Sequence, residues 1–424
     1  MCKSKKLLTG AIINPSPKQK YPSMARSPAS PAGKPPPADP SLSTSGQLMS
    51  SSASTSSFYI GNYKESQSWK SSKSSGASSL ASLREALPEQ PRIYDFSEIR
   101  SATKNFTQPA LSSSSTSTAW RCGLRGQDVV VIQRKFRRLI ETPELIERVA
   151  MICRSHHSSL IPLKGVTVSG NYIYLVYEYV HGANLREALR NPRNPNFTIL
   201  SNWTLRIQIA SDIASGLDYI HNSTGIGFEF IHNHIKSSSI IITEPALNAR
   251  ICHFGTAELC GEIAKRKAES DVEIESSSKE IKFEGTRGYM APEFQSSGAV
   301  SQRSDVYAFG VVVLELVSGK EALTYIVDEE TGGYERISVI ETARTAFGGG
   351  RIRGWVDRRL RDSYPVEVAE KLVRLALECL DDNPNVRPEM GQVAVRVSQM
   401  YLDSLTWATK IGGPADITVS LGPR

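Results

Sequence analysis

The spacing of apolar residues along the chain predicts a strand-rich part followed by a helical part. Order is expected to begin with a helix in residues 94–106, YDFSEIRSATKNF, whose apolar side chains recur at about every third or fourth position. Residues 200–223 repeat the helical spacing over a longer stretch. Between them the pattern predicts strands at 128–136, 161–168 and 171–180 and a helix at 144–155. Strands followed by helices favour an α+β fold of two lobes.

The two ends of the chain lack such a pattern. Residues 1–90 are rich in Ser, Pro and Lys and poor in large apolar residues, so they cannot bury enough surface to offset their ordering entropy. They are predicted to be a disordered tail, and residues 403–424 a flexible one. The net charge of +7 lies in the first of these, since residues 1–90 hold eleven basic and four acidic side chains and the remainder holds 39 of each. The folded part is therefore neutral, and no nucleic-acid partner is expected.

Cysteine usage and hydropathy indicate a soluble chain in a reducing compartment. The six cysteines form no CxxC pair, and no apolar run approaches the roughly 18 residues that a membrane span needs. No secretory signal follows the basic residues 1–6, so a cytoplasmic protein is expected. Cys2 lies beside Lys3, Lys5 and Lys6, and its acylation would give peripheral contact with the plasma membrane. A plain solvated tail and a transit peptide are the alternatives.

Several motifs in the later part of the chain resemble those of protein kinases. They are LVYEYVHGANLREAL (175–189), GTRGYMAPEF (285–294), SDVYAFGVVVLEL (304–316) and NPNVRPEM (383–390). YDFSEIRSATKNF, together with VDRRLRDSYP at 356–365, is similar to plant receptor-like kinases, especially those of the LysM receptor type. The resemblance implies a bilobal protein-kinase fold. Its small lobe and hinge would occupy residues 91–180 and its larger helical lobe residues 181–402.

The resemblance also implies where the catalytic groups of a kinase would stand. Phosphoryl transfer needs a glycine-rich cradle, a lysine held by a carboxylate, a base and metal ligands. In the first lobe these positions hold Ser112, Ser114 and Ser117 for the glycines, Gln133 for the lysine, Arg148 for its carboxylate partner, Val131 for the adenine ceiling, and Glu178 and Tyr179 for the hinge. Serine suits a phosphate cradle poorly, because glycine alone lets the backbone approach closely at positive φ.

The stretch FIHNHIKSSSIIITEPALNARICHFG (230–255) carries the remaining catalytic positions. The base position falls on His234, the two metal-ligand positions fall on Ser239 and His253, and only Lys236 is retained. Since losing one electrostatic stabiliser commonly costs about 10²–10³ in rate, these changes together leave no ordinary Mg·ATP chemistry. Neither ATP nor magnesium is expected as a cofactor, and no metal site is assigned.

The residues that hold the two lobes together in this family are present. The resemblance implies a packed column of Ile152, Leu163, His232 and Phe254, anchored by Asp305, and a buried pair between Glu293 and Arg387. The residues that differ from the family pattern are thus concentrated at the catalytic positions, while the residues that pack the two lobes together match it. This contrast favours a pseudokinase that acts as a scaffold or allosteric partner of other receptor-like kinases.

Three other hypotheses remain open at the level of the sequence. The chain could be a weak or unorthodox serine/threonine kinase that still binds ATP and uses Lys135 or Lys236 on phosphate. His234 and His253 could form a zinc, copper or pH-sensitive site. The segment containing Ser276, Ser277 and Ser278 could be a phosphoacceptor or docking loop.

Overall fold

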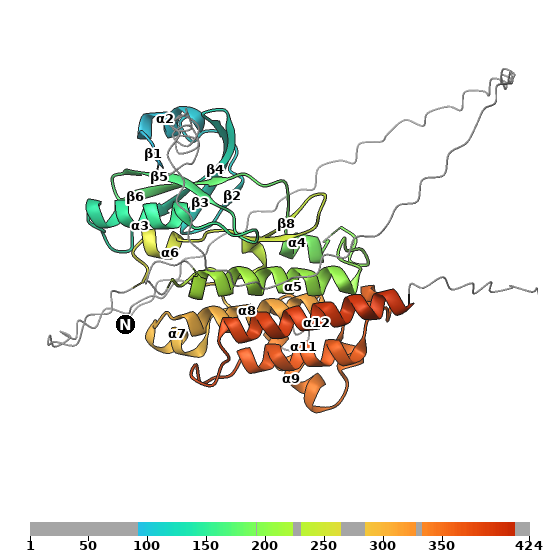
Figure 1. Ribbon diagram of the computed structural model, residues 1–424. Helices are drawn as coiled ribbons and strands as arrows, with labels where there is room; N and C mark the ends of the chain where they lie inside the picture. The colour runs from blue at the N-terminus through green and yellow to red at the C-terminus, as the bar shows by residue number, and fades with distance from the viewer. Residues whose placement is uncertain (1–91, 192, 224–229, 264–284, 328–332, 412–424) are drawn as a thin grey trace, which may run out of the picture. The chain divides into compact units, whose positions relative to one another are not determined.

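The computed structural model describes residues 92–191, 193–223, 230–263, 285–327 and 333–411 (Figure 1). They form a β-sheet lobe and a helical lobe, which confirms the predicted α+β, two-lobe fold. The predicted tail 1–90 with Cys2, and the serines at 276–278, lie outside the described residues. Among the described helices, none is long and apolar enough to cross a membrane.

The first lobe is a six-stranded sheet with a helix on each face. The strand order is β1-β5-β6-β4-β3-β2, antiparallel throughout except for the parallel pair β1 and β5. The strands are β1 (Arg92–Ile93), β2 (Ser112–Ser113), β3 (Ser117–Leu124), β4 (Gln127–Lys135), β5 (Leu163–Ser169) and β6 (Tyr172–Glu178). Helix α2 (Phe96–Ala102) covers the outer face, and α3 (Thr142–Arg154) lies on the face that continues into the second lobe (Figure 1).

A small separate core explains why α2 stays on the sheet. Asp95 caps the helix by accepting a hydrogen bond from Ser97 N at 2.7 Å. Ile99 is fully buried, and Phe96 and Phe106 stack on Tyr174 of β6 with ring centroids 5.2 and 5.4 Å away. The sheet is therefore buried on both faces. Apolar alternation alone consequently does not tell which side chains of β4 face α2 and which face the second lobe.

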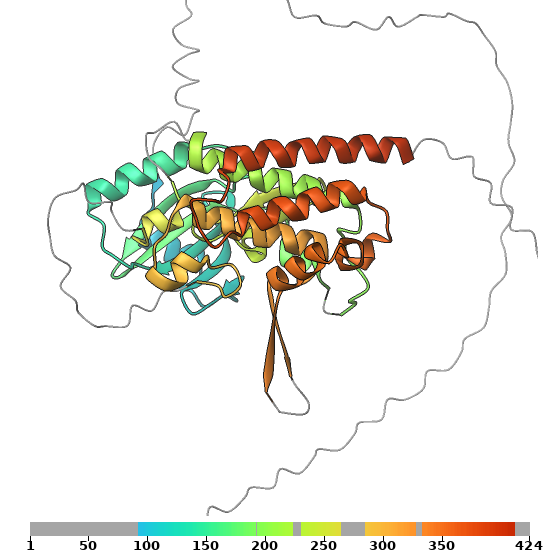
Figure 2. The ribbon, with the colours of Figure 1, turned by 90° about the horizontal axis from the view of Figure 1, so that it is seen from below.

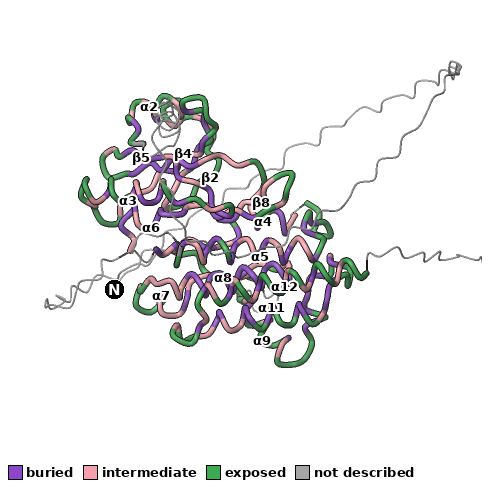
Figure 3. Tube along the Cα trace, in the orientation of Figure 1, coloured by how far each residue is buried: buried purple, intermediate pink, exposed green. Residues whose placement is uncertain are grey.

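The second lobe is built around α8 (Gln302–Ser318), which is buried at every residue from Asp305 to Ser318 (Figure 3). A helix that is apolar on all sides lies inside a protein rather than on its surface. The helices around it are α4 (Leu185–Leu189), α5 (Trp203–Asp218), α7 (Pro292–Ser297), α9 (Val339–Gly348), α10 (Ile352–Trp355), α11 (Val366–Cys379) and α12 (Met390–Ile411). Three single turns complete the lobe: Tyr219–Ser223, Ser237–Ser239 and Arg358–Leu360.

A small sheet and a short helix frame the loop that carries the candidate chemistry. Strands β7 (Gly182–Asn184), β8 (Ile240–Thr243) and β9 (Ala249–Ile251) pair in that order, and α6 (Thr256–Leu259) follows them. Residues 230–236 precede β8 without regular structure. The loop therefore lies between the first strands of the second lobe and the central helix α8.

Two features of the second lobe differ from the sequence-based expectations. The flexible tail was expected from residue 403, but α12 continues to Ile411, because Ser404 is fully buried and accepts a hydrogen bond from Trp203 Nε1 at 2.9 Å. Residues 412–424 lie outside the described part. A hairpin of β10 (Leu323–Val327) and β11 (Tyr334–Ser338) also projects from the lobe, and no motif predicted it (Figure 2).

The predicted pair between Glu293 and Arg387 is present and joins α7 to the segment before α12. Arg387 Nη1 and Nη2 donate to the two carboxylate oxygens of Glu293, each at 2.7 Å. The guanidinium is fully buried and also donates to the carbonyls of Asp381 and Arg303. Removing one partner of such a bidentate, buried ion pair leaves the other charge unpaired and lowers the stability of the fold.

Truncating this pair on one side should destabilise the second lobe strongly. We expect Arg387→Met to lower the free energy of unfolding by about 3–5 kcal/mol, since it leaves a poorly solvated carboxylate unpaired. Denaturant unfolding would measure it, with Arg396→Met as the matched control. Arg396 pairs with Glu378 at a site where both side chains are 40% exposed, so a loss within about 1 kcal/mol is expected there. Equal losses for the two variants would contradict this account.

Candidate functional site

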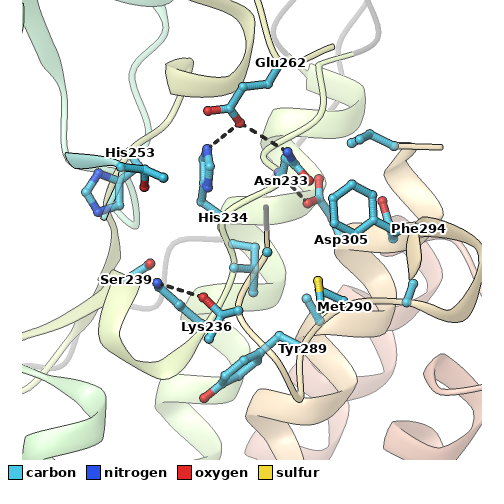
Figure 4. Close-up of a pocket in the computed structure, with 18 of the residues that line it drawn as sticks. Asn233, His234, Lys236, Ser239, His253, Glu262, Tyr289, Met290, Phe294 and Asp305 are labelled. Carbon is cyan, nitrogen blue, oxygen red and sulfur yellow. Dashed lines mark hydrogen bonds and ion pairs between the residues drawn. The ribbon is translucent and has the colours of Figure 1, made fainter. Parts of the chain in front are cut away.

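A cavity of about 620 Å³ brings together most of the residues that the sequence assigned to the phosphate and metal positions (Figure 4). Ser114, Ser117, His234, Lys236, Ser239 and His253 all line it, together with Asp305. Ser112, Val131, Gln133, Arg148, Glu178 and Tyr179 do not line it. The wall is completed by Arg134, Asn233 and Glu262 and, on the far side, by residues of the segment 285–300.

The register assigned to β4 is wrong by one residue. Gln133 was expected at the lysine position and Val131 at the adenine ceiling, but both face α2. Val131 packs in the outer core, and Gln133 Nε2 donates to Tyr174 Oη at 2.9 Å. Because side chains alternate along a strand, Ile132 and Arg134 face the other lobe instead. Lys135 is exposed on the α2 side and is directed away from the cavity.

Arg134 is therefore the basic residue that β4 directs into the cavity, and the sequence analysis missed it. The signal was present, since Arg134 adjoins Gln133 and is itself a cation. Its guanidinium is paired with Glu262, which lies seven residues after Gly255. Nothing in the motif spacing pointed to Glu262, because its position depends on how the chain folds after α6.

Arg148, expected at the position of the lysine's carboxylate partner, lies on α3 and is directed toward α6. Its Nη1 donates to the Glu258 carbonyl at 2.9 Å and to Glu258 Oε2 at 3.0 Å. Its Nη2 donates to Glu144 Oε1 at 2.6 Å, one turn back on the same helix. Arg148 thus ties α3 to the chain after β9 and makes no contact with β4.

The serine-rich turn between β2 and β3 satisfies its own backbone. Ser114 N donates to Ser117 O at 2.8 Å, and Ser114 Oγ accepts from the amides of Thr116 at 3.4 Å and Ser117 at 3.2 Å. Backbone amides are the groups with which a phosphate cradle binds its ligand. In this turn the Ser114 hydroxyl takes up two of them.

Asp305 of α8 fixes the backbone of the loop at residues 230–236. Its Oδ2 accepts from His232 N at 2.7 Å and lies 3.0 Å from His221 Nε2, and its Oδ1 accepts from Asn233 N at 2.8 Å. Although burial opposes ionisation, the hydrogen bonds from His221 and His232 hold the pKa of Asp305 below its ordinary value. The loop is thus attached to the central helix through its main chain.

The packing residues expected as a column are all buried. Ile152, Leu163, His232 and Phe254 are at most 2% exposed. The Ile152 side chain lies against Gly255, where an added Cβ would come within 3.0 Å of it. His232 Nε2 lies 2.8 Å from the Cys252 carbonyl, which links the loop to the strand end before His253.

The hinge residues are engaged with their neighbours. Glu178 lies 2.8 Å from Lys164 Nζ and 3.7 Å from Arg250 Nη1, and the Arg121 guanidinium stacks 3.8 Å above the Tyr179 ring. Tyr177, which the sequence analysis did not single out, is buried and its hydroxyl donates to the Phe254 carbonyl at 2.8 Å. This bond joins the sheet to the segment that carries His253.

Glu262 lines the cavity and lies above His234 and Asn233 (Figure 4). Its carboxylate pairs with Arg134, lies 2.9 Å from His234 Nε2 and accepts from Asn233 Nδ2 at 3.3 Å. Burial alone would raise its pKa, but the neighbouring His234 and Arg134 outweigh burial and lower it to about 2. Glu262 therefore stays ionised at neutral pH.

Lys236, Ser239 and His253 line the same cavity below Glu262. Lys236 Nζ donates to Thr286 Oγ1 at 3.1 Å (Figure 4). Ser239 Oγ and His253 Nδ1 are buried and have no hydrogen-bond partner among the described residues. His234 and His253 lie with their ring centroids 6.5 Å apart, and no three His, Cys, Asp or Glu side chains come together as metal ligands in the described part of the chain.

The model of the protein kinase domain matches residues 128–397, which run from β4 of the first lobe into α12 of the second. The chain belongs to the protein kinase family. It is 33% identical over 336 residues to LysM domain receptor-like kinase 3 of Arabidopsis thaliana, covering 78% of this chain and 49% of that protein. It is 31% identical to Chitin elicitor receptor kinase 1 of the same plant, covering 74% and 47%. The kinase chain thus spans about half the length of these relatives.

Among solved structures, the kinase fold is similar to the pseudokinase domain of BIR2, described as an immune regulator of the RLK/Pelle family. The TM-score is 0.56 with 25% sequence identity, and the match covers 78% of this chain and 96% of that one. The resemblance to plant receptor-like kinases of the LysM type, predicted from the motifs, is confirmed.

The buried His232 should make the stability of this kinase domain depend on pH. Burial is the main cause that lowers the pKa of His232 from 6.5 to about 4, so the folded chain binds this proton later than the unfolded chain. The stabilisation is complete above pH 6.5 and is lost as the pH falls toward 4.

This dependence can be measured by denaturant unfolding of wild type and His232→Gln, which keeps a donor for the Cys252 carbonyl and removes the titration. Between pH 6.5 and 5 the wild type should lose about 2 kcal/mol more than the variant. His181→Gln, at an exposed position, is the control and should follow the wild type. Parallel profiles for wild type and His232→Gln would rule out His232 as the source.

Proposed function

We propose that this chain is a pseudokinase, a kinase-shaped binding module that acts as a scaffold or allosteric partner of other receptor-like kinases. The observation that carries the proposal is the content of the cavity. Where the kinase reaction needs a carboxylate base and carboxylate and amide oxygens on magnesium, the cavity presents His234 at the base position and Ser239 and His253 at the metal-ligand positions. Magnesium binds oxygen ligands in octahedral geometry, so this set of side chains does not fit it.

The surroundings of the cavity support the same conclusion. Arg134 is held by Glu262, so the cation of β4 is neutralised from within the chain. The amides of the serine turn are partly used by Ser114. Each of these contacts would have to break before a triphosphate could be bound in the usual way, and each break costs free energy that nucleotide binding must supply.

The likeness to the pseudokinase domain of BIR2 and the relation to receptor-like kinases support the choice of partner class. A catalytically inactive kinase fold keeps the surfaces with which kinases contact one another, and the fold alone does not require activity. The expected partners are other receptor kinases associated with the membrane. The expected location is beside them, in the cytoplasm or at the plasma membrane.

The alternative is a weak serine/threonine kinase that still binds ATP, and one observation favours it. Lys236 reaches Thr286 in the cavity, a contact that would place Lys236 near a transferred phosphate. Lys135, the other lysine considered, is exposed on the opposite face of the sheet and is excluded from this role. Lys236 alone leaves the metal unbound, so we favour the pseudokinase.

Nucleotide should therefore not stabilise the folded chain. Thermal unfolding of the full chain would be measured with ATP in the presence of magnesium, of manganese and of EDTA. A ligand at 100 times its dissociation constant would add about 2.7 kcal/mol, and we expect no resolvable shift under any of the three conditions. Transfer of labelled phosphate from ATP to a generic protein substrate, measured on the same samples, should be at background. An active receptor kinase domain provides the positive control.

A metal-dependent shift together with phosphate transfer would overturn the proposal. Loss of that transfer in Lys236→Met, with Lys135→Met unchanged, would then establish the alternative kinase. Lys135→Met is the matched control for Lys236→Met, because only Lys236 lines the cavity.

A further inference from the structure

Three hydrogen-bond donors in the cavity have no anionic partner. Ser239 is fully buried with its hydroxyl unpaired, and Nδ1 of His253 is buried and unpaired as well. Lys236 contacts the hydroxyl of Thr286 and forms no ion pair with any acid among the described residues. Buried polar groups are nearly always hydrogen-bonded, so such a group in a cavity marks the place of an absent partner.

The polarity of the site indicates what that partner is. A kinase uses acceptor oxygens as its base and around its metal, whereas here the base position holds His234 and the metal-ligand positions hold Ser239 and His253, all of which can donate. Lys236 lies between His234 and Ser239 in the loop. Exchanging acceptors for donors converts a cation site into an anion site.

The chain already binds one anion of its own in this cavity. The Glu262 carboxylate lies among Arg134, His234 and Asn233, which are the donors on one side. Figure 4 shows its contacts with His234 and Asn233. Lys236, Ser239 and His253 on the other side do not contact it. Arg134, His234 and Asn233 are therefore satisfied by the chain's own carboxylate, whereas Lys236, Ser239 and His253 have no anionic partner among the described residues.

Burial and the neighbouring positive charge both disfavour the charged forms of Lys236 and His253. Burial, followed by the positive charge of Arg134 and Arg186, lowers the pKa of Lys236. Burial, followed by the neighbouring His234, lowers the pKa of His253 well below its ordinary value. An anion entering beside them would favour the charged form of each group and so raise both pKa values.

We propose that this cavity binds the phosphoryl group of a phosphoserine or phosphothreonine in a partner protein, through Lys236, Ser239 and His253, without nucleotide or metal. The inference rests on the proposed pseudokinase function and names the partner chemistry of the same site. A phosphoryl group brings nearly two negative charges and three acceptor oxygens, which matches three donors of which one is charged.

The shape of the cavity favours a phosphorylated peptide over a nucleotide. Its wall continues from Lys236 to Thr286, Phe294 and Val300 and does not reach the hinge residues Glu178 and Tyr179. At about 620 Å³ it has the size of a ligand pocket and can hold a phosphorylated side chain with part of its backbone. On the side toward the sheet, Ala119 and Ile132 are buried in the main core and do not line the cavity.

Binding would be tested on the full chain with fluorescein-labelled nonapeptide pools that have a fixed central residue and random flanks. The pools carry phosphothreonine, phosphoserine, threonine or glutamate at the centre, and anisotropy is read in EDTA. The phosphorylated pools should bind at least about 10-fold tighter than the threonine and glutamate pools, since hydrogen bonds to charged groups contribute that much. Inorganic phosphate and ATP are added as competitors.

The variants distinguish this site from nonspecific charge attraction. Lys236→Met should weaken binding of the phosphothreonine pool by about 10-fold or more and Ser239→Ala by about 3-fold or more, while Lys135→Met on the opposite face changes nothing. Glu262→Gln removes the internal anion, frees Arg134 and His234, and should tighten binding by about 5-fold or more. Glu258→Gln, in the same segment but outside the cavity, is its matched control and should leave the affinity unchanged.

A gain of affinity in Glu262→Gln cannot arise from misfolding, so it separates the inference from a merely structural effect. Equal affinity for phosphorylated and unphosphorylated pools, or binding unaffected by Lys236→Met, would overturn it. Displacement by inorganic phosphate at the peptide's own concentration would make free phosphate the ligand, and tighter binding of ATP would make it a nucleotide. Both outcomes overturn the peptide assignment. Phosphate transfer is measured separately, so failure of peptide binding leaves the pseudokinase proposal standing.

Discussion

The buried carboxylate of Asp305 is the interaction on which the candidate site depends. It lies on α8, the fully buried helix of the second lobe, and accepts hydrogen bonds from the backbone amides of His232 and Asn233. A buried charge is tolerated only when it is well paired, and removing these donors would leave it unsatisfied. The loop conformation is thus set by its main chain and by one acid behind it. The side chains that face the cavity contact Glu262 and Thr286 and are not part of the hydrophobic core.

Because of this separation, the side chains at the cavity can differ without loss of the fold. His234, Lys236 and Ser239 follow the two residues that Asp305 holds, and they are directed into the cavity rather than into the core. Exchanging an acid for histidine at such a position alters charge but no packing. His232, by contrast, is fully buried and bonded to the Cys252 carbonyl, so it belongs to the structural set. The contrast between packing and chemical residues, seen in the sequence, has this physical basis.

The sequence predicted the fold class and singled out His234, Lys236, Ser239 and His253 of the cavity, but neither Glu262 nor the orientation of β4. Apolar alternation normally tells the two faces of a strand apart, yet Val129, Val131 and Ile132 are all buried because α2 covers the outer face. The register was therefore open, and Gln133 was assigned to the wrong face. The end of α12 was also misjudged, since the bond between Trp203 and Ser404 joins residues 201 positions apart. Long-range contacts of this kind leave no local pattern.

The position of Glu262 follows from a charge balance that no single motif contains. An active kinase pairs a cation on its third strand with an acid on the neighbouring helix. Here β4 offers Arg134 and α3 offers Arg148, and two cations cannot satisfy one another. The segment after Gly255 supplies an acid to each, Glu262 to Arg134 and Glu258 to Arg148. These four residues hold α6 and the chain that follows it against the first lobe. Arg148 of α3 thus holds Glu258, 110 residues further along the chain, while Arg134 of β4 holds Glu262, the acid that lines the cavity.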